Sequence, residues 1–492
     1  MKKAIVVGAG IGGLSSAIRL AHQGWQVQVF EQNSGAGGKM SEYQAQGFRW
    51  DMGPSVITMR HVIEGLFNDV GRTLTEYLTL LPLDPLTRYF YPDGTQLNVT
   101  SNLTEMLNQI DDLEPRDVEG YLRYLSYVAR IYRITAPVFI ENQPPKLHDF
   151  LSVPVWEMPH VDPLRTMSQS IQQFVKHPKL QQLLGRFATY TGASPYLAPA
   201  TLNVIAHVEL NQGVWYPQGG IYSIAKALEQ VAVELGVHIH YNHPVKSILT
   251  QHGVAYGVAL ADDTPILSDI VLANADVGFV YDKLIRDQSS ALQQHTERLL
   301  QMEPSCSGLI FMWGIDRSFS ELAHHNILFS QDYAREFHQL FTEQKMPDDP
   351  TIYLAITSKT DSSHAPAGCE NWFVLVNAPA LSPHFDWNAQ LPSYRERVLD
   401  KLSDFGLNIR PHLKHERILT PHDLERLTNA RRGALYGTSS NNRFAAFNRP
   451  HNRSQHIDHL YFVGGTTHPG GGVPMVMLSA KVVTEMIQAD FA

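Results

Sequence analysis

The sequence is poor in cysteine, in long apolar runs and in basic residues. Only Cys306 and Cys369 occur among 492 residues, which excludes a disulfide framework and a cysteine-ligated zinc finger. No window approaches the roughly 18 uninterrupted apolar residues that a membrane-spanning helix needs. Because 39 Lys and Arg stand against 48 Asp and Glu, the net charge of −9 argues against nucleic acid as a partner. We expect a protein of a reducing compartment that does not span a bilayer.

The chain does contain enough apolar material for a large core. With 43% hydrophobic and 18% charged residues it is globular, and its length suits two to four structural units at about 100 to 200 residues each. The basic and apolar start, Met1–Val7, is only superficially like a signal peptide, because Gly8–Gly13 interrupts it at once. We predict a buried strand over residues 1 to 8.

A glycine-rich turn follows this strand. Gly8, Gly10 and Gly13 form a G-x-G-x-x-G pattern, and Leu14–Gln23 then places its apolar residues on one helical face. In such a turn the first glycine permits the bend, the second removes a side chain where a pyrophosphate approaches, and the third lets the helix pack on the strand. Free amides at the helix N-terminus would face the anion. The pattern predicts a dinucleotide site.

An acidic residue stands where a ribose would lie. The alternating stretch Trp25–Phe30 predicts a second strand, and Glu31 follows it, 18 positions after Gly13. A carboxylate there suits a pair of ribose hydroxyls and would repel a ribose phosphate, so the ligand is FAD or NAD rather than NADP. Two further glycine turns, Gly35–Met40 and Asp51–Ser55, favour the longer flavin dinucleotide.

Two distant segments complete the predicted nucleotide domain. Residues 237–273 are typical of a returning β-meander and a strand of the parallel sheet, which ends at Asn274. Near the C-terminus, a buried strand over His459–Val463 leads into the glycine block Gly464–Gly472 and then into a helix with Pro474 in its first turn. The positive end of that helix would stabilise negative charge that develops on a flavin ring.

These motifs together resemble the bacterial-type phytoene desaturase family of carotenoid desaturases. The resemblance covers essentially the whole chain, and its more specific parts are Gly213–Gly220 and Gly470–Pro474. It implies an α/β fold: a Rossmann-type FAD-binding domain of the GR2-like flavoproteins with an inserted α+β substrate domain. The segments Thr189–Tyr196 and His207–Leu210 are similar to the branch with hydroxycarotenoid 3,4-desaturases and diapolycopene oxidases.

The resemblance also implies boundaries and cofactor contacts. Residues 1–75, 215–290 and 421–492 would form a discontinuous FAD-binding domain, with residues 76–214 and 291–420 as the substrate and membrane-associating domain. The residues expected to hold FAD come from the glycine regions and the segments beside them: Gly8, Ala9, Gly10, Gly12, Gly13, Glu31, Gln32, Gly38, Lys39, Met40, Gly53, Pro54, Ser55, Val245, Asn274, Gly464, Gly465, Val473, Pro474, Met475 and Val476.

The implied reaction needs little acid–base catalysis. A carotenoid has no acidic proton and no carbonyl, so dehydrogenation removes a hydride from an allylic carbon and then a proton from the neighbouring carbon. The polyene delocalises the cation, and the flavin carries the difficult step before oxygen or a quinone takes its electrons. Glu209 and His468 are the candidate proton acceptors, and a hydrogen-bonded structural role is the favoured alternative for each.

Two further features concern metals and membranes. His238, His240 and His243 lie close in the sequence, but we predict a solvated strand face and no metal site. The aromatic residues and arginines of Tyr121–Ile134 suit a membrane interface or, the favoured interpretation, an amphipathic core helix. The apolar, proline-containing segment Phe150–Pro159 favours membrane contact. Because a polyene is insoluble in water, we predict a peripheral, monotopic protein on the cytoplasmic face of a membrane.

Other functions remain open. A carotenoid oxidase and a carotene isomerase would share the fold. A flavin amine oxidase would share it too, but the segment around His468 contains no aromatic residue to flank an amine. A flavin-stabilised binding protein is the alternative outside enzymes.

Overall fold

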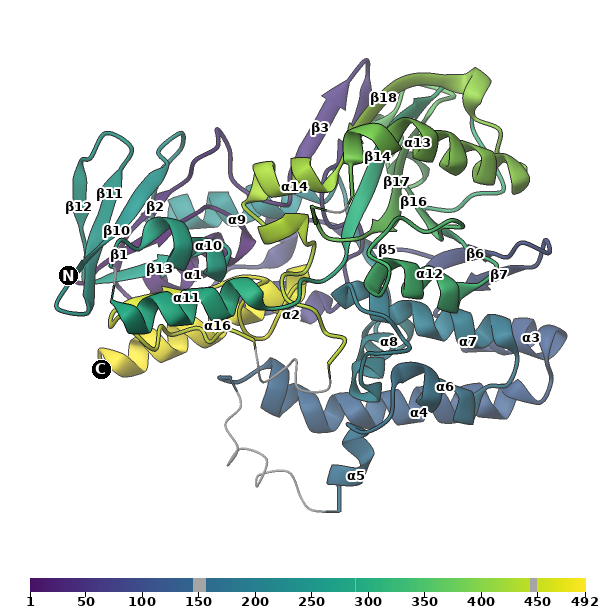
Figure 1. The fold of residues 1–492 in the computed structure, drawn as a ribbon, viewed down its shortest axis with the longest axis horizontal. Coiled ribbons are helices and arrows are strands. Elements are labelled where there is room, and N and C mark those ends of the chain that lie inside the picture. Colours follow the sequence, from purple (N-terminus) through teal and green to yellow (C-terminus); the bar gives the residue numbers. More distant parts are fainter. Residues whose placement is uncertain (145–155, 288, 384, 443–448) are drawn as a thin grey trace.

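A parallel sheet organises one half of the molecule. The computed structural model describes residues 1–144, 156–287, 289–383, 385–442 and 449–492 (Figure 1). The neighbouring strands of this sheet are all parallel. Their order is β19 (Leu460–Phe462), β13 (Ile270–Ala273), β1 (Lys3–Val7), β2 (Gln26–Phe30) and β9 (His238–His240). The predicted N-terminal strand is confirmed, and the sheet forms only when three distant parts of the chain meet.

Each face of this sheet packs on a different layer. Because side chains of a strand alternate between faces, Ala4 and Val6 join one hydrophobic core while Ile5 and Val7 join another. The first face is covered by helices and the second by an antiparallel meander with a further helix. The helices of the first face are α1 (Ile11–His22), α9 (Tyr222–Glu234) and α16 (Val473–Asp490); the second face carries β10 (Val245–Gln251), β11 (Val254–Leu260), β12 (Pro265–Leu267) and α11 (Ser290–Gln301).

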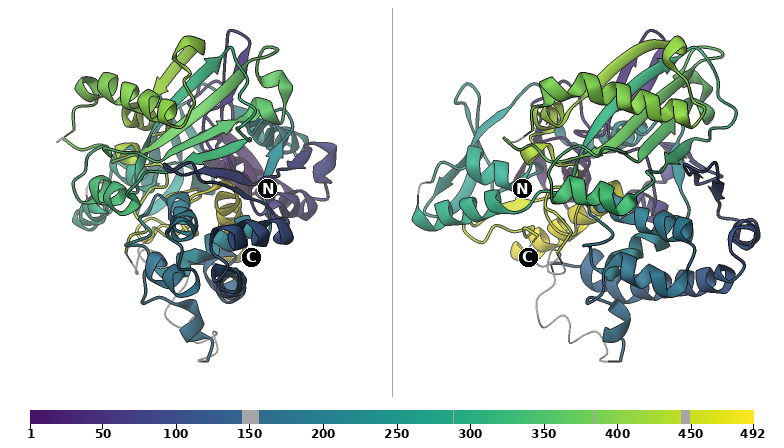
Figure 2. Two further views of the ribbon diagram at one scale, coloured as in Figure 1. Left: turned by 90° about the vertical axis from the view of Figure 1, so that its right-hand side faces the viewer. Right: turned by 45° about the vertical axis from the view of Figure 1, so that its right-hand side comes forward.

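A second, mainly antiparallel sheet organises the other half. Its order is β18 (Leu413–Leu419), β14 (Ser307–Ile315), β17 (Glu370–Ala378), β16 (Ile352–Ile356), β15 (His325–Leu328), β6 (Thr87–Phe90) and β7 (Gln96–Val99). One face packs on α13 (Trp387–Asp404), which lies on the outside of the molecule in Figure 2. The pair β15 and β6 is the one parallel pair among its neighbouring strands.

Helices lie below this second sheet, in the blue part of Figure 1. The largest is α4 (Asp117–Thr135), which buries Tyr121, Tyr124, Val128 and Ile131 while its arginines are exposed. The interpretation of this segment as a core helix is therefore confirmed. The other elements of this part are α3 (Leu103–Leu113), α5 (Met158–Val161), α6 (Met167–Phe174), α7 (Pro178–Gly185), η4 (Arg186–Thr191), η5 (Ala200–Asn203) and α8 (Val204–Leu210). Helix α12 (Tyr333–Phe341), green in Figure 1, packs against this part through Phe337 and Tyr196.

Short elements connect the two halves. Two small antiparallel pairs, β3 with β4 and β5 with β8, lie where the chain passes between them. Their bounds are β3 (Glu42–Ala45), β4 (Phe48–Asp51), β5 (Leu80–Pro82) and β8 (Trp215–Pro217), and the remaining helices are α2 (Arg60–Asp69), α10 (Val277–Phe279) and α14 (Pro421–Thr428). The α/β fold class is confirmed, whereas the domain boundaries stay a prediction. No helix within the described residues is long and apolar enough to cross a membrane.

Candidate active site

The first glycine turn has the geometry that the motif predicts. Gly8 adopts a left-handed conformation with φ of +97°, and a Cβ on Gly13 would lie 2.1 Å from the Gly8 carbonyl oxygen. Helix α1 then begins at Ile11 with Gly10 as its N-cap, and no side chain caps it. The amides of its first turn are thus left for another acceptor, which suits a phosphate.

Asn274 explains the second glycine of the motif. A Cβ on Gly10 would lie 2.6 Å from Asn274 Oδ1, and a Cβ on Gly464 would lie 2.9 Å from Asn274 Nδ2. The same Nδ2 donates to the Val463 carbonyl over 3.0 Å. Asn274 therefore joins the N-terminal turn to the C-terminal glycine block, and its close approach demands glycine at position 10 whether or not a pyrophosphate lies there.

Glu31 closes the far end of the turn. Its Oε2 accepts a hydrogen bond from the Ala9 amide at 2.7 Å, and its Oε1 accepts bonds from the amide and the side chain of Asn33 at 2.9 and 2.8 Å. A carboxylate offers about four acceptor positions, so capacity is left for ribose hydroxyls. Gln32 is exposed beside it, and Val245 is half-buried at the start of β10.

The second glycine turn lies directly on the first. The Gly37 amide donates to the Ala9 carbonyl over 2.8 Å, and a Cβ on Gly38 would lie 3.2 Å from the Cα of Gly10. Lys39 lies deep enough that burial lowers the pKa of its ammonium, yet its side chain is accessible. Both observations hold when Lys39 faces an internal hollow. Met40 is fully buried, so its side chain does not share that position.

The C-terminal glycine block brings a second helix N-terminus to the same place. Helix α16 begins at Val473, with Pro474 in its first turn and no side-chain cap at Gly472. A Cβ on Gly12 would lie 3.0 Å from the Val476 side chain, so the starts of α16 and α1 are adjacent. Within the glycine block, Gly465 lies close to Gly471. Met475, in the first turn of α16, is half-buried. Two uncapped helix ends therefore converge.

A buried ion pair fastens the Gly213–Gly220 motif to the turn that begins at Asp51. Tyr216 donates to Asp51 Oδ2 over 2.7 Å, and Arg49 lies 2.7 Å from Asp51 Oδ1. A Cβ on Gly220 would lie 2.0 Å from the guanidinium of Arg49. This contact explains the glycine at position 220, and the adjoining residues Gly53, Pro54 and Ser55 are half-buried.

Sequence reasoning missed Arg449 and Tyr436, which both face the glycine block. Arg449 donates to the Gly465 carbonyl over 3.2 Å, and its guanidinium would lie 3.1 Å from a Cβ on Gly470. Burial lowers the pKa of Arg449 to about 10, and among the described residues no carboxylate pairs with it. Tyr436 lies against Gly471. The glycine block therefore has no aromatic neighbour along the sequence, but it has one in the folded structure. Neither residue stands in a recognisable motif.

The candidate proton acceptors are both engaged by other groups. Glu209 accepts a hydrogen bond from Arg186 at 2.6 Å and another from the Tyr190 hydroxyl. His468 is buried, and its Nε2 lies 2.9 Å from the Asn142 carbonyl oxygen. Burial lowers the pKa of His468 to about 4, so its imidazole is neutral at pH 7 and Nε2 donates to that carbonyl. A catalytic role for either residue stays a prediction.

Three tyrosines combine a raised pKa with partial exposure. Burial raises the pKa of Tyr190, Tyr353 and Tyr436 strongly, but each side chain is only half-buried. They come from η4, from β16 and from the segment before the glycine block.

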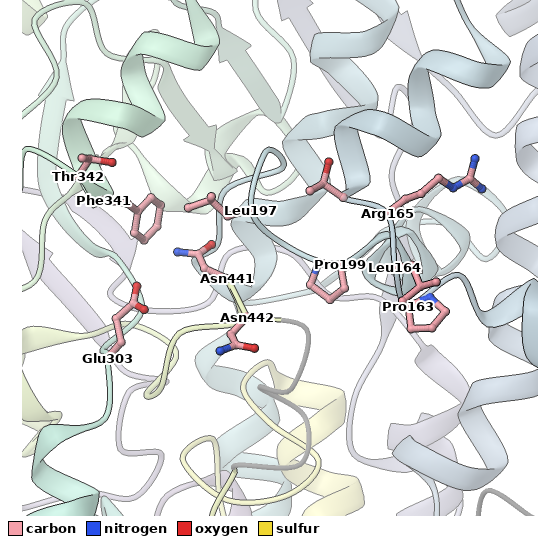
Figure 3. A pocket seen from close by; sticks show the side chains of 11 residues that line it. Pro163, Leu164, Arg165, Leu197, Pro199, Glu303, Phe341, Thr342, Asn441 and Asn442 are labelled. Atoms are coloured by element: carbon pink, nitrogen blue, oxygen red, sulfur yellow. The ribbon is translucent and has the colours of Figure 1, made fainter.

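A separate pocket opens at the surface of the helical part. It has a volume of about 540 Å³ and lies where the loop before α6, the end of α12 and the chain near Asn441 meet (Figure 3). Leu164 and Leu197 line it and are 74% and 49% exposed. These apolar side chains sit beside polar ones such as Glu303 and Arg165.

One of the three histidines near Glu31, His240, is less exposed than predicted. The ring of His240 stacks on Phe30 with centroids 4.7 Å apart, so the strand face of β9 is solvated only in part. His238 is exposed, and the His243 amide donates to the Glu31 carbonyl over 2.9 Å. Within the described ranges no three His, Cys, Asp or Glu side chains gather as metal ligands do.

The site fits a flavin dinucleotide on its own geometry. Two uncapped helix N-termini and closely apposed glycines form a backbone cradle without side chains. Lys39 and Arg449 supply cationic groups beside it, as a pyrophosphate requires. Glu31 supplies acceptors at the far end.

Comparisons with known proteins agree with this geometry. The family model for flavin-containing amine oxidoreductases matches residues 11–486. A 4,4'-diaponeurosporene oxygenase of Staphylococcus haemolyticus is 37% identical over 492 residues, which cover 99% of this chain and 97% of the relative. A 1-hydroxycarotenoid 3,4-desaturase of a Flavobacterium species is 37% identical over 495 residues, which cover 99% of both chains. An oxidoreductase from Methanosarcina mazei shares the fold with a TM-score of 0.67 at 18% identity, covering 98% of this chain and 100% of that one.

Proposed function

The chain belongs to the family of flavin-containing amine oxidoreductases, and on this premise we propose that it is an FAD-dependent desaturase of acyclic carotenoids. The observation that carries the proposal is the identity of 37% along essentially the whole chain with two enzymes named for carotenoid substrates.

The residues of the two glycine turns and the glycine block would hold the cofactor. When bound, FAD supplies the acceptor for a hydride from an allylic carbon. Gly8, Gly10 and Gly13 would admit the backbone to the pyrophosphate, and Glu31 would accept bonds from the ribose. The N-terminus of α16 would stabilise negative charge at the flavin ring.

Proton loss then requires only an acceptor of modest strength. The cation left on the polyene is delocalised, so its neighbouring C–H is acidic and water or a neutral side chain suffices. His468, neutral at pH 7, keeps Nδ1 available as such an acceptor. The electrons pass afterwards to oxygen or a quinone.

Oxidation of a terminal carbon is the second candidate activity. The Staphylococcus haemolyticus relative is named an oxygenase and is as similar as the desaturase. Both reactions begin with electron removal from an allylic position, so the same cofactor site serves either. An amine oxidase is less well supported, because the relatives at 37% identity are named for carotenoid substrates.

We propose further that the protein lies on a membrane surface, on its cytoplasmic face. Trp156 is 76% exposed, and Leu164 and Leu197 beside the surface pocket are exposed too. They belong to the helical part around α5, which projects at the lower end of Figure 1. Trp156 belongs to the predicted membrane segment Phe150–Pro159, of which residues 150–155 lie outside the described residues.

A matched pair of variants tests the membrane surface. We expect Leu164→Glu to reduce flotation of the purified protein with anionic liposomes, because a charge in the apolar contact is costly. Leu267→Glu, at a leucine of 61% exposure on β12, is the control and should float as the unchanged protein does. Equal flotation of both variants would exclude this end as the contact.

Product mass tests the activity. The enzyme should be expressed in cells that accumulate phytoene, and separately lycopene, hydroxylated carotenoids or C30 analogues. Loss of two hydrogens per step indicates desaturation, gain of oxygen indicates terminal oxidation, and an unchanged mass with altered absorbance indicates isomerisation. No change with any polyene would refute the proposed function.

A further inference from the structure

The surface pocket of the helical part has both apolar and polar walls. Its volume of about 540 Å³ lies within the range of sites that hold small organic groups. Leu164 and Leu197 line it with exposed apolar side chains, at the end of the molecule that we propose to face the membrane. The side chains of Thr166, Thr342 and Asn441 add neutral polar groups. A ligand that matches this lining has an apolar part and a polar part.

The two charged side chains of the lining differ in their pairing. Arg165 is held by Asp162, with Nε 3.0 Å from Oδ1 and Nη2 2.6 Å from Oδ2. The guanidinium of Arg165 also points away from Asn441 in Figure 3. Glu303 is exposed, and within the described part of the chain its carboxylate has neither an ion pair nor a hydrogen bond. The uncompensated charge of this lining is therefore negative, and it attracts a cationic group.

An aromatic ring lies in the same wall as this carboxylate. Figure 3 shows Phe341 and Glu303 on one side of the pocket and Pro163 and Leu164 on the other. The Phe341 side chain is half-buried and its ring stacks on that of Phe337, with the centroids 6.2 Å and the planes 4° apart. The face of an aromatic ring attracts an organic cation, and a carboxylate does so too. Both groups favour an ammonium group on the ligand.

Membrane lipids differ in whether they carry such a group. The headgroups of phosphatidylethanolamine and phosphatidylcholine end in an ammonium group, whereas those of glycolipids and phosphatidylglycerol do not. Beside Glu303, an ammonium group gains a Coulomb attraction that a sugar lacks, and a headgroup with a phosphate alone meets repulsion. The exposed leucines suit the acyl chains of any of these lipids. The choice between them therefore depends on the headgroup charge.

We propose that this pocket binds the headgroup of a membrane phospholipid that ends in an ammonium group, with Glu303 and Phe341 as the side chains that bind the cation. This inference rests on the proposed position at a membrane surface and adds a preference among lipids to it. The acyl chains of the bound lipid lie along Leu164 and Leu197, outside the pocket. A lipid held in this way fixes the orientation of the helical part at the membrane.

Flotation on two kinds of vesicle tests the proposal. One kind consists of phosphatidylcholine and the other of digalactosyldiacylglycerol, so both surfaces have no net charge and only the first carries ammonium groups. The holoenzyme is measured by the flavin absorbance of the floated fraction, which does not count cofactor-free protein. We expect the ratio of the two partition coefficients to favour phosphatidylcholine.

Two variants and a control locate the preference. Glu303→Gln removes the charge and Phe341→Leu removes the ring, and each should lower the ratio about two- to fivefold, the effect of one exposed ion pair or cation–π contact. Glu297→Gln changes an exposed glutamate of α11 that does not line the pocket. This control has the same net charge as Glu303→Gln and should keep the ratio of the unchanged protein.

The outcomes separate this inference from the membrane surface itself. Equal partition of the unchanged protein, a ratio that Glu303→Gln and Phe341→Leu both retain, or an equal fall in the control would overturn the inference, while flotation would still support the membrane surface. Flotation with neither kind of vesicle would overturn both.

Discussion

Arg449 offers the sharpest test of the cofactor site, because one substitution should move two measurements in opposite directions. Its guanidinium lies against Gly465 and Gly470 and, among the described residues, has no acidic partner. Without an anion, this charge destabilises the folded chain; with an anion beside it, the same charge contributes to binding. We consider Arg449→Met, which keeps much of the volume and removes the charge.

The structure sets the size of both effects. Burial lowers the pKa of Arg449 to about 10. Against an ordinary value of about 12.5, and at about 1.36 kcal/mol per pH unit, the difference corresponds to roughly 3 kcal/mol. Partial exposure of the side chain reduces this to roughly 2 kcal/mol. The apoprotein should gain up to that amount of stability on loss of the charge, while a lost charge-assisted bond should weaken FAD binding about 10- to 100-fold.

Two assays and a control decide the matter. Urea unfolding of the flavin-free protein gives the free energy of unfolding, and quenching of flavin fluorescence gives the Kd for FAD. Arg449→Lys keeps the charge, so it should bind FAD more tightly than Arg449→Met and should not stabilise the apoprotein. An Arg449→Met variant that binds FAD as tightly as the unchanged protein would refute the assignment of Arg449 to the cofactor.

Three further predictions concern stability. Gly13→Ala should lower the free energy of unfolding by about 1 to 3 kcal/mol, because the new Cβ would lie 2.1 Å from a backbone oxygen. Gly65→Ala, in open space within a helix, should raise it by about 0.5 to 1 kcal/mol, and equal urea midpoints for the two variants would contradict this. Tyr216→Phe breaks a buried bond to a carboxylate and should cost about 1.5 to 3 kcal/mol, while Tyr77→Phe, which breaks an exposed one, should stay within about 0.5 kcal/mol. The pKa of His468 is about 4 in the folded chain and about 6.5 in the unfolded chain, so its contribution to the free energy of unfolding is complete above pH 6.5 and falls by roughly 3 kcal/mol as the pH drops to 4. In urea unfolding across this window, the stability of His468→Gln should depend less steeply on pH than that of the unchanged protein, and an equally steep dependence would contradict the assignment.

Local patterns in the sequence were sufficient for the nucleotide-binding elements. The strand before Gly8, the turn over Gly8–Gly13 and the helix after it follow from neighbouring residues, and the structure has them as β1 and α1. The position of Pro474 in the first turn of α16 follows in the same way. Backbone conformation and helix ends are decided by residues a few positions apart, so one sequence is enough to read them.

The roles of individual side chains depended on contacts between distant segments. Glu209 was predicted to be a proton acceptor or, as the favoured alternative, a hydrogen-bonded structural group, and only the structure identifies Arg186 and Tyr190 as the partners of its two oxygens. Tyr436 lies many residues before Gly471, and yet it packs against it. No pattern of neighbours encodes either contact, because each joins residues from separate elements of the chain.

The sequence by itself determined that a dinucleotide cradle exists, since glycine turns, a strand and a helix start are local choices of the backbone. The tertiary structure alone decided what surrounds that cradle. It placed Asn274 against Gly10, left Arg449 without an acidic partner among the described residues, and buried Arg186 beside unpaired polar atoms. The physical reason is that desolvation and pairing of charges depend on everything within a few ångströms in space, and most of those neighbours are far apart along the chain.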